Sequence, residues 1–299
     1  CLVGSEMCIR DRWYTDWLAV RGVNLFIPHA FYYSIRGKRK DERPPDVGPH
    51  SIWWAHYDAW SSYWRRLSWL MTDIDLHAEA AVLCRNRDLC PDTVRPLFER
   101  QIGFQYIPES YFPACTVEDG ALCLHGHRYT AVLGDKALFP DAAHPEVSAL
   151  EPDCRCDPPQ PMLRCAYFNK EGRACWLLVN EGNTPIKTRL TLPVDAPLCR
   201  YDLWNGQPCA CPAERTAKGA CLPLELPARG SLLLFTCTAR ESEALPLPPT
   251  YLSLAAPDFA LADEDATHLT KTYRATLQIT ATELQTATPL LTLPGQEMA

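Results

Sequence analysis

The sequence offers little that points to a membrane, a nucleic acid or a nucleotide cofactor. Its 299 residues hold no apolar run long enough to cross a bilayer, because the longest candidates, such as 232–235, have the length of a strand. The formal net charge of -7 gives no reason to expect a nucleic acid or an anionic membrane as partner. G-x-G-x-x-G, Walker-loop and G-x-S-x-G motifs are lacking too, so we expect no cofactor.

Cysteine is frequent, but its spacing does not indicate a metal site. Of fifteen cysteines, two lie within the first twelve residues, and the rest occur singly or as C-x-C pairs at 154/156 and 209/211. Zinc sites usually use pairs two to four residues apart, and the sequence has no C-x-x-C, so we expect no metal. We expect buried free thiols instead, which favours a reducing compartment such as the cytoplasm. The missing natural N-terminus leaves the localisation open.

The first twelve residues differ in kind from the rest. Residues 1–12 resemble a translated sequencing-adapter read-through and have neither the apolar core nor the cleavage site of a signal peptide. We therefore interpret them as an artefact and expect natural sequence from near Trp13, inside a longer gene. We expect a truncation at Ala299 as well. The length leaves room for two or three domains.

Residues 13–74 are crowded with aromatic side chains and indicate a strand, a long loop and a helix. The segment 22–27 has strand composition and ends at Pro28, which cannot extend a ladder. A charged loop follows over 36–48. After this loop, apolar residues recur every three or four positions, which predicts a helix with one buried face. We expect this face to pack against the preceding strand. This face holds Trp53, Tyr57, Trp60, Trp64, Leu67 and Met71.

Residues 75–150 alternate strand and helix signals and predict a small α/β domain. The expected elements are a helix over 91–102, strands over 78–84 and 104–107, and a hairpin formed by 120–124 and 128–133.

Residues 151–242 predict a β-sandwich, because short apolar runs alternate with turn signals. Its strands are expected over 163–168, 174–179, 187–192, 199–203 and 231–237. Residues 243–299 hold a proline-rich linker and the start of another β unit, with strands over 272–279 and 290–293.

Four segments carry a family resemblance: RGVNLFIPH at 21–29, GPHSIWW at 48–54, YWRRLSW at 63–69 and HAEAAVL at 77–83. With the order of the domains, they resemble multidomain glycoside hydrolases, above all the α-L-rhamnosidase-like family 106, with kinship to families 2 and 42. The resemblance implies a multidomain α/β plus all-β fold. Its parts would be the C-terminal end of a (β/α)8 barrel at 13–74, a flavodoxin-like α/β domain at 75–150, a β-sandwich at 151–242, and a linker with a truncated sugar-binding jelly roll at 243–299.

The catalytic residues implied by this resemblance are absent from the sequence. Glycosidic hydrolysis usually needs two carboxyl groups about 5–10 Å apart, and in barrels these follow earlier strands than the one at 22–27. No Asp or Glu here matches a catalytic motif. Asp41, Glu42 and Asp46 could line a cleft, but a loop with five neighbouring Lys and Arg residues is more simply a solvated, salt-bridged surface.

Five residues are candidates for sugar binding. His29 follows the expected strand end and could bind a sugar hydroxyl, or could be satisfied by backbone. Of Phe31, Tyr32 and Tyr33, which follow it, one could form an aromatic wall of a sugar subsite, and at least one belongs to a core. Asn24 would point away from its strand neighbours into the barrel. Trp54 lies off the buried helix face and could be a sugar platform or core.

Three functions stay open on sequence. The first is a fragment of an α-L-rhamnosidase-like or β-galactosidase-like enzyme that removes terminal sugars from oligosaccharides, inactive by itself, with carbohydrate as its partner. The second is a non-catalytic carbohydrate-binding or domain-assembly module, whose α/β domain contacts other subunits of a homo-oligomer. An α/β enzyme acting on a non-carbohydrate substrate is the third, and no nucleotide or nucleophile motif favours it.

Overall fold

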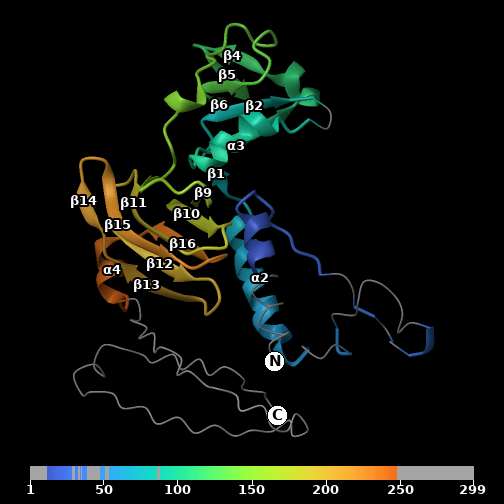
Figure 1. Cartoon of the computed structure of the whole chain (residues 1–299), viewed down its shortest axis with the longest axis vertical. Helices are drawn as coiled ribbons and strands as arrows, with labels where there is room; N and C mark the ends of the chain where they lie inside the picture. Colours follow the sequence, from blue (N-terminus) through green and yellow to red (C-terminus); the bar gives the residue numbers. More distant parts are fainter. Residues whose placement is uncertain are drawn as a thin grey trace, which may run out of the picture.

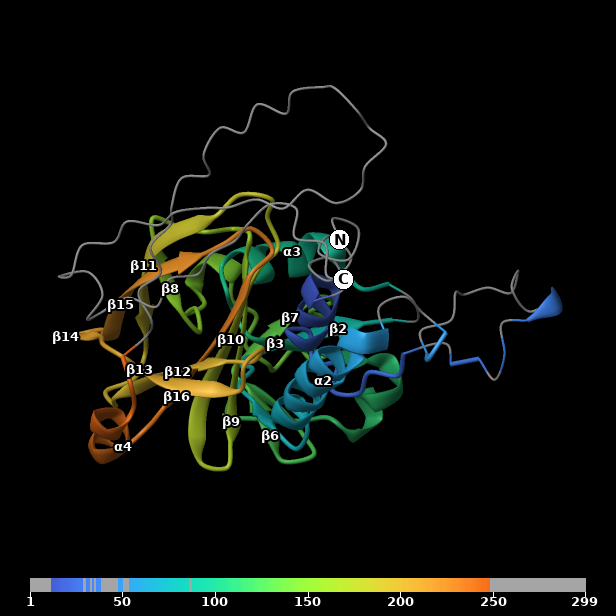
Figure 2. The same cartoon turned by 90° about the horizontal axis from the view of Figure 1, so that it is seen from below.

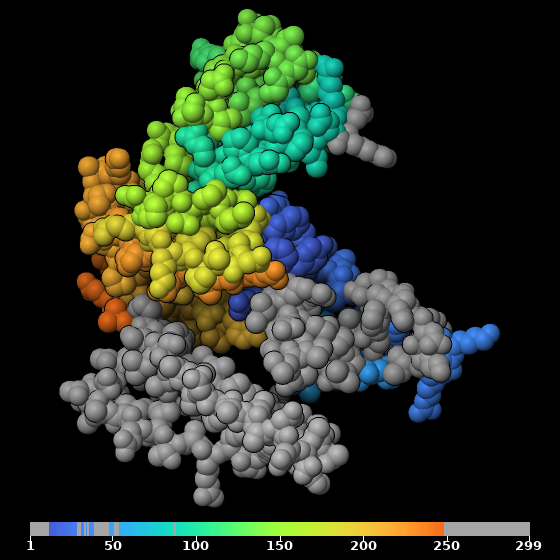
Figure 3. All heavy atoms as spheres, in the orientation of Figure 1, coloured from blue at the N-terminus to red at the C-terminus, as the bar shows by residue number. Residues whose placement is uncertain are grey.

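The structure is a computed structural model that describes residues 12–28, 31, 32, 34, 36–38, 48–50, 54–85 and 88–247. A β-sandwich with helices on one side carries a smaller α/β unit (Figure 1). Figure 3 shows this unit, in green, as a lobe at one end of the sandwich, which is yellow and orange. Within these residues no helix is both long and apolar enough to traverse a membrane.

Two antiparallel sheets form the sandwich. The six-stranded sheet has the order β1 (Asp75–Leu76), β9 (Leu163–Lys170), β10 (Arg173–Asn180), β16 (Ser231–Thr236), β12 (Leu198–Asp202) and β13 (Gln207–Cys211). The four-stranded sheet has the order β14 (Glu214–Thr216), β15 (Gly219–Leu226), β11 (Ile186–Leu192) and β8 (Arg155–Asp157). The five sandwich strands expected from the sequence are confirmed, while β1, β8, β13, β14 and β15 are additional.

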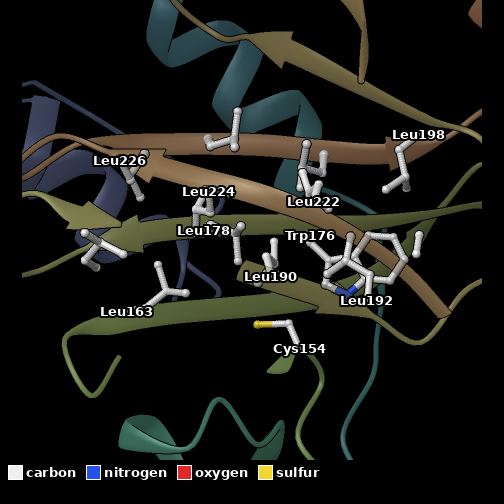
Figure 4. Packing of buried hydrophobic residues seen from close by; sticks show 14 residues of the cluster. Cys154, Leu163, Trp176, Leu178, Leu190, Leu192, Leu198, Leu222, Leu224 and Leu226 are labelled. Carbon is white, nitrogen blue, oxygen red and sulfur yellow. The ribbon is translucent and has the colours of Figure 1, made fainter. Parts of the chain in front are cut away.

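The inner core lies between these two sheets (Figure 4). Along β11, buried and exposed residues alternate, as a strand with one covered face requires. Leu163, Trp176 and Leu190 are fully buried in this core. The Trp176 indole Nε1 donates a hydrogen bond to the Asp153 carbonyl at 3.1 Å, so its one polar group is satisfied.

A local turn sets the register of the β9–β10 hairpin. Glu171 and Gly172 both have positive φ, 51° and 78°, which is the backbone of the two-residue turns that suit strand twist. The Asn169 side chain accepts a hydrogen bond from the Gly172 amide at 2.9 Å. The register then pairs Arg173 with Lys170 and Trp176 with Tyr167.

Two helices cover the outer face of the six-stranded sheet: residues 12–19 and α2 (Tyr57–Met71), the latter preceded by the short 3-10 helix η2 (Trp54–His56). The α2 residues on this face are Trp60, Tyr63, Leu67, Leu70 and Met71. The expected partner of this helix was the segment 22–27; the main partner is the six-stranded sheet, and from that segment Phe26 packs against the same cluster. Tyr63 and Leu70 belong to the buried face, whereas Tyr57 and Trp64 of the predicted face are only half-buried. Trp53 lies outside the described residues.

The strand predicted over 22–27 is also wrong. Residues 23–28 are in no strand, and Leu25 and Ile27 are exposed. A strand needs a neighbour for its backbone groups, and no described strand pairs with this segment. Consequently the inward direction expected for Asn24 is wrong, because Asn24 is exposed on irregular chain.

The α/β unit has a parallel sheet with β2 at its centre. The order is β3 (Phe104–Pro108), β2 (Ala80–Cys84) and β7 (Ala131–Leu133), and β2 is buried along its length, as expected. The helix α3 (Pro91–Glu99) packs on one face. On the other face lies an antiparallel sheet of β4 (Thr116–Glu118), β5 (Ala121–Leu124) and β6 (His127–Tyr129).

The single strand expected over 128–133 is divided in the structure. β6 pairs with β5 in the predicted hairpin, whereas β7 leaves it and pairs in parallel with β2. Three short helices complete the described chain: η3 (Glu109–Ala114), η4 (Val147–Ala149) and α4 (Ala239–Ala244). The jelly-roll strands expected over 272–279 and 290–293 lie outside the described residues.

Candidate functional site

An aromatic surface extends from the chain before α2 along the first half of that helix. Phe31 and Trp54 are 48% and 39% exposed. The Trp54 and Tyr57 rings stack at 5.0 Å, and the Phe31 ring stands edge-on to Tyr57 at 5.6 Å. Tyr57 in turn meets the half-buried Trp64 at 6.3 Å. We call Phe31, Trp54, Tyr57 and Trp64 the aromatic surface.

Helical spacing explains this surface. Tyr57 and Trp64 lie seven residues apart, which places them on one side of α2. Trp60 and Tyr63 occupy the side that faces the sheet, and both contact Trp204 at 5.6 Å. The aromatic surface is therefore anchored to the core through ring contacts.

The sandwich contributes Trp204, in the turn that follows β12, and two interactions hold this turn. The Asp202 carboxylate accepts a hydrogen bond from the Trp204 amide at 2.8 Å. The Arg66 guanidinium donates hydrogen bonds to the carbonyls of Leu203 and Trp204 at 3.1 and 2.8 Å. Trp204 is 36% exposed, so a fixed aromatic edge remains open to solvent.

The structure describes three of the five candidate residues from the sequence. Trp54 is exposed within the aromatic surface, Tyr32 is half-buried near it in sequence, and Asn24 is exposed on irregular chain. His29 and Tyr33 lie outside the described residues. A sugar-binding role for any of the five stays a prediction.

A second feature, a polar cleft of about 480 Å³, was missed by the sequence analysis. At its base the His77 ring nitrogen Nδ1 lies 2.8 Å from the Asp153 carboxylate. Asp153 is buried, and burial raises the pKa of its carboxyl. The Asp153 hydrogen bond raises the pKa of His77 in turn. The cleft is lined by His77, Glu79, Glu151, Pro152, Asp153, Arg155, Tyr167, Thr191, Pro193 and Lys218.

Close backbone packing holds this pair in place. A Cβ atom on Gly103 would come within 2.6 Å of the Asp153 Oδ2 atom, so only glycine fits there. The His77 ring also packs on Tyr167 at 4.7 Å, and Tyr167 stacks on Trp176 at 4.7 Å. His77 and Asp153 are 76 residues apart, and only the fold brings them together.

Chemically, the His77–Asp153 pair is an oriented imidazole. Such a pair can exchange protons with a bound group if that group lies within hydrogen-bond reach of the second ring nitrogen. Glu79 lies 3.9 Å from this nitrogen. The pair also links the β1–β2 connection to the chain before β8, so a structural role accounts for it equally well. Among the described residues, no group of three or more His, Cys, Asp or Glu side chains could hold a metal ion.

The arrangement of sandwich, flanking helices and α/β unit is shared with one solved enzyme structure. It is similar to the rhamnosidase from Novosphingobium sp. PP1Y, with a TM-score of 0.57 and 12% identity over 76% of this chain and 29% of that chain. The chain thus spans less than a third of that enzyme. At this identity the likeness shows the fold alone.

Two weaker similarities have TM-scores too low to support an argument. A β-galactosidase from Bacillus circulans sp. alkalophilus has a TM-score of 0.33 and 11% identity over 64% of this chain and 46% of that chain. A GH27 β-L-arabinopyranosidase from Geobacillus stearothermophilus has a TM-score of 0.22 and 17% identity over 29% of this chain and 19% of that chain. No family model and no curated protein matches the sequence.

Proposed function

We propose that this chain is part of a glycoside hydrolase of the α-L-rhamnosidase-like or β-galactosidase-like kind, which removes terminal sugars from oligosaccharides. The observation that carries the proposal is the fold shared with a rhamnosidase over 76% of the chain. The family resemblance of the sequence segments at 21–29, 48–54, 63–69 and 77–83 points the same way.

In this proposal the chain supports catalysis without performing it. The parent's catalytic carboxylates lie on barrel strands outside this chain, and 13–74 adjoins that barrel. The chain spans 29% of the rhamnosidase, which leaves room for such a catalytic part. The parts at 75–150 and 151–242 then act as flavodoxin-like and sandwich domains around it, and 243–299 as a linker with the start of a sugar-binding jelly roll.

A second candidate is a non-catalytic carbohydrate-binding module, and the aromatic surface favours it. Sugar rings present C–H faces that pack on aromatic π-faces, and Trp54 and Phe31 are both partly exposed to solvent. Trp54 stacks on Tyr57 and would keep its orientation on binding, so little conformational entropy would be lost. Subunit contacts through the α/β unit belong to the same candidate.

One pair of assays on the purified chain separates these functions. With p-nitrophenyl α-L-rhamnoside and β-D-galactoside, we expect no turnover above buffer, and clear turnover would contradict the assignment of catalysis to the rest of the parent. Binding to a glycan array is the second assay. If the aromatic surface binds sugar, Trp54→Ala weakens binding by about three- to tenfold, the worth of one aromatic contact.

Tyr111→Ala is the matched control for the binding assay. Tyr111 is an exposed aromatic residue in η3 of the α/β unit, away from the aromatic surface. We expect its loss to leave glycan binding unchanged. Equal effects of the two substitutions, or no glycan binding by the unmodified chain, would refute the binding role of the aromatic surface.

A further inference from the structure

A cavity of about 640 Å³ opens between the second half of α2 and the outer face of the six-stranded sheet. Figures 1 and 2 place α2 beside this sheet. The cavity takes part in neither the aromatic surface nor the polar cleft. Its apolar lining comes from α2, β10, β12 and β16, namely Trp69, Leu70, Cys175, Tyr201, Leu203, Leu233 and Phe235.

Positive charge gathers around this apolar lining, although the chain as a whole carries -7. Four cationic side chains line the cavity, namely Arg65, Arg66, Lys170 and Arg173, against one acidic residue, Glu171. Of the four, Arg173 is neutralised, because its guanidinium makes two hydrogen bonds to the Glu241 carboxylate at 2.7 and 3.1 Å. Three cations and the Glu171 carboxylate remain, so the lining keeps a net positive charge.

Lys170 is the most unusual of the three, because it is buried. Its ammonium donates to the Thr72 carbonyl at 2.5 Å and lies 4.8 Å from the centre of the Trp69 ring. No ion pair between described residues includes Lys170. A buried ammonium without a carboxylate is costly, so an anion beside it would be favourable.

The two arginines that line the cavity also lack a carboxylate partner among the described residues, although Arg65 is exposed and Arg66 is half-buried. Arg65 donates to the Ser62 hydroxyl at 3.2 Å, and Arg66 donates only to main-chain carbonyls. Neither forms an ion pair with a described carboxylate. A guanidinium can hold a ligand carboxylate through two parallel hydrogen bonds, and Arg65 retains unused donors for this.

From this combination we propose that the cavity binds an acidic sugar, a uronate whose carboxylate meets the cations while its C–H face packs on the aromatic lining. Trp69, Tyr201 and Phe235 supply aromatic area, and the volume lies in the range of small-molecule sites. A neutral sugar would leave the three cations unpaired. Inorganic phosphate would leave the apolar lining uncovered. A ligand that carries both a carboxylate and a C–H face matches both the cations and the aromatic lining.

Isothermal titration calorimetry of the whole chain tests this proposal with three probes. These are trigalacturonate, the matched neutral galactotriose and inorganic phosphate. We expect trigalacturonate to bind more tightly than either of the others. Its binding should weaken as NaCl rises from about 0.05 to about 0.5 M, since salt screens charge pairs that solvent reaches.

Two substitutions and one control locate the site. Arg65→Gln and Lys170→Gln are each expected to weaken trigalacturonate binding by about three- to tenfold, the effect of removing one partner of a charge-assisted contact. Arg65 is on the exposed side of α2, so its variant keeps the test valid if Lys170→Gln fails to fold. Arg200→Gln is the control, because Arg200 shares a sheet face with Leu198 of the inner core, opposite to Tyr201.

The binding results either support or contradict uronate binding in the cavity. Preferential binding of trigalacturonate that falls in Arg65→Gln and persists in Arg200→Gln supports the proposal. Absence of binding, equal binding of galactotriose or phosphate, or equal losses in both arginine variants would overturn it. Trp54→Ala should leave uronate binding intact, so failure of the aromatic surface as a glycan site is distinguishable from failure here.

Discussion

Replacing Asp16 by asparagine is expected to stabilise the protein at neutral and alkaline pH. Asp16 is fully buried between the first helix and the sheet and accepts a hydrogen bond from the Tyr63 hydroxyl. Burial raises the pKa of Asp16 from 3.8 to about 6, and the smaller effects of Tyr63, Ser231 and Arg12 lower it only in part. Ionisation of this carboxylate therefore lowers the stability of the folded protein.

The sign and size follow from proton linkage. Because the folded pKa lies above the unfolded one, the favourable contribution is complete below pH 3.8 and is lost as pH rises through about 6. At about 1.4 kcal/mol per pKa unit, the difference between 3.8 and about 6 corresponds to about 3 kcal/mol. Asparagine avoids that loss and still accepts from Tyr63, but its amide nitrogen would replace Oδ2, which is buried and forms no hydrogen bond to a described residue, so we expect a net gain of about 1–2 kcal/mol above pH 7.

Urea unfolding followed by tryptophan fluorescence measures this gain at about pH 5 and about pH 8. The unmodified chain should lose stability between these values, and Asp16→Asn should lose less. Asp58→Asn is the control, since Asp58 is an exposed carboxylate on α2. If Asp16→Asn is less stable than the unmodified chain at the higher pH, the reasoning about the buried carboxylate is refuted.

Two further predictions concern the cleft and the core. Because the Asp153 hydrogen bond raises the pKa of His77, that contribution to stability is present at pH below about 6.5 and is lost as pH rises through the folded pKa. His77→Gln should flatten this part of the pH profile in thermal melts, and an unchanged profile would exclude the pair as its origin. Leu190→Ala should cost about 3 kcal/mol in urea unfolding, because Leu190 is fully buried in the inner core. Lys187→Ala, exposed on the same strand, should cost less than about 1 kcal/mol, and equal costs would contradict the assigned core.

The sandwich strands could be predicted because their signals are local. An Asn-Lys-Glu-Gly turn at 169–172 between two apolar runs predicts a hairpin, and β9 and β10 form it. Two of the missed strands carry contrary signals. β13 and β15 each contain a proline, Pro208 and Pro223, and proline lowers the expectation of a strand although sheet neighbours can accommodate it.

The candidate site could be predicted only in part. The spacing of the helix places Trp54 off the buried face, and the structure leaves it exposed. Trp204 approaches Trp60 and Tyr63 only because β12 ends beside α2. The His77–Asp153 pair could not be predicted: His77 begins the segment 77–83 that carries the family resemblance, but nothing in the sequence indicates Asp153 as its partner.

The sequence alone determined the elements whose residues interact with near neighbours: the hairpin turn, the alternation along β11, the buried run of β2 and the amphipathic pattern of α2. The tertiary structure alone decided which surfaces these elements share. It gave α2 a sheet as its main partner in addition to Phe26 of the segment 22–27, it turned Tyr63 and Leu70 inward, and it moved β7 from its hairpin to the side of β2. The reason is physical: periodicity records that a face is buried, whereas the partner that buries it depends on contacts between residues far apart in the chain.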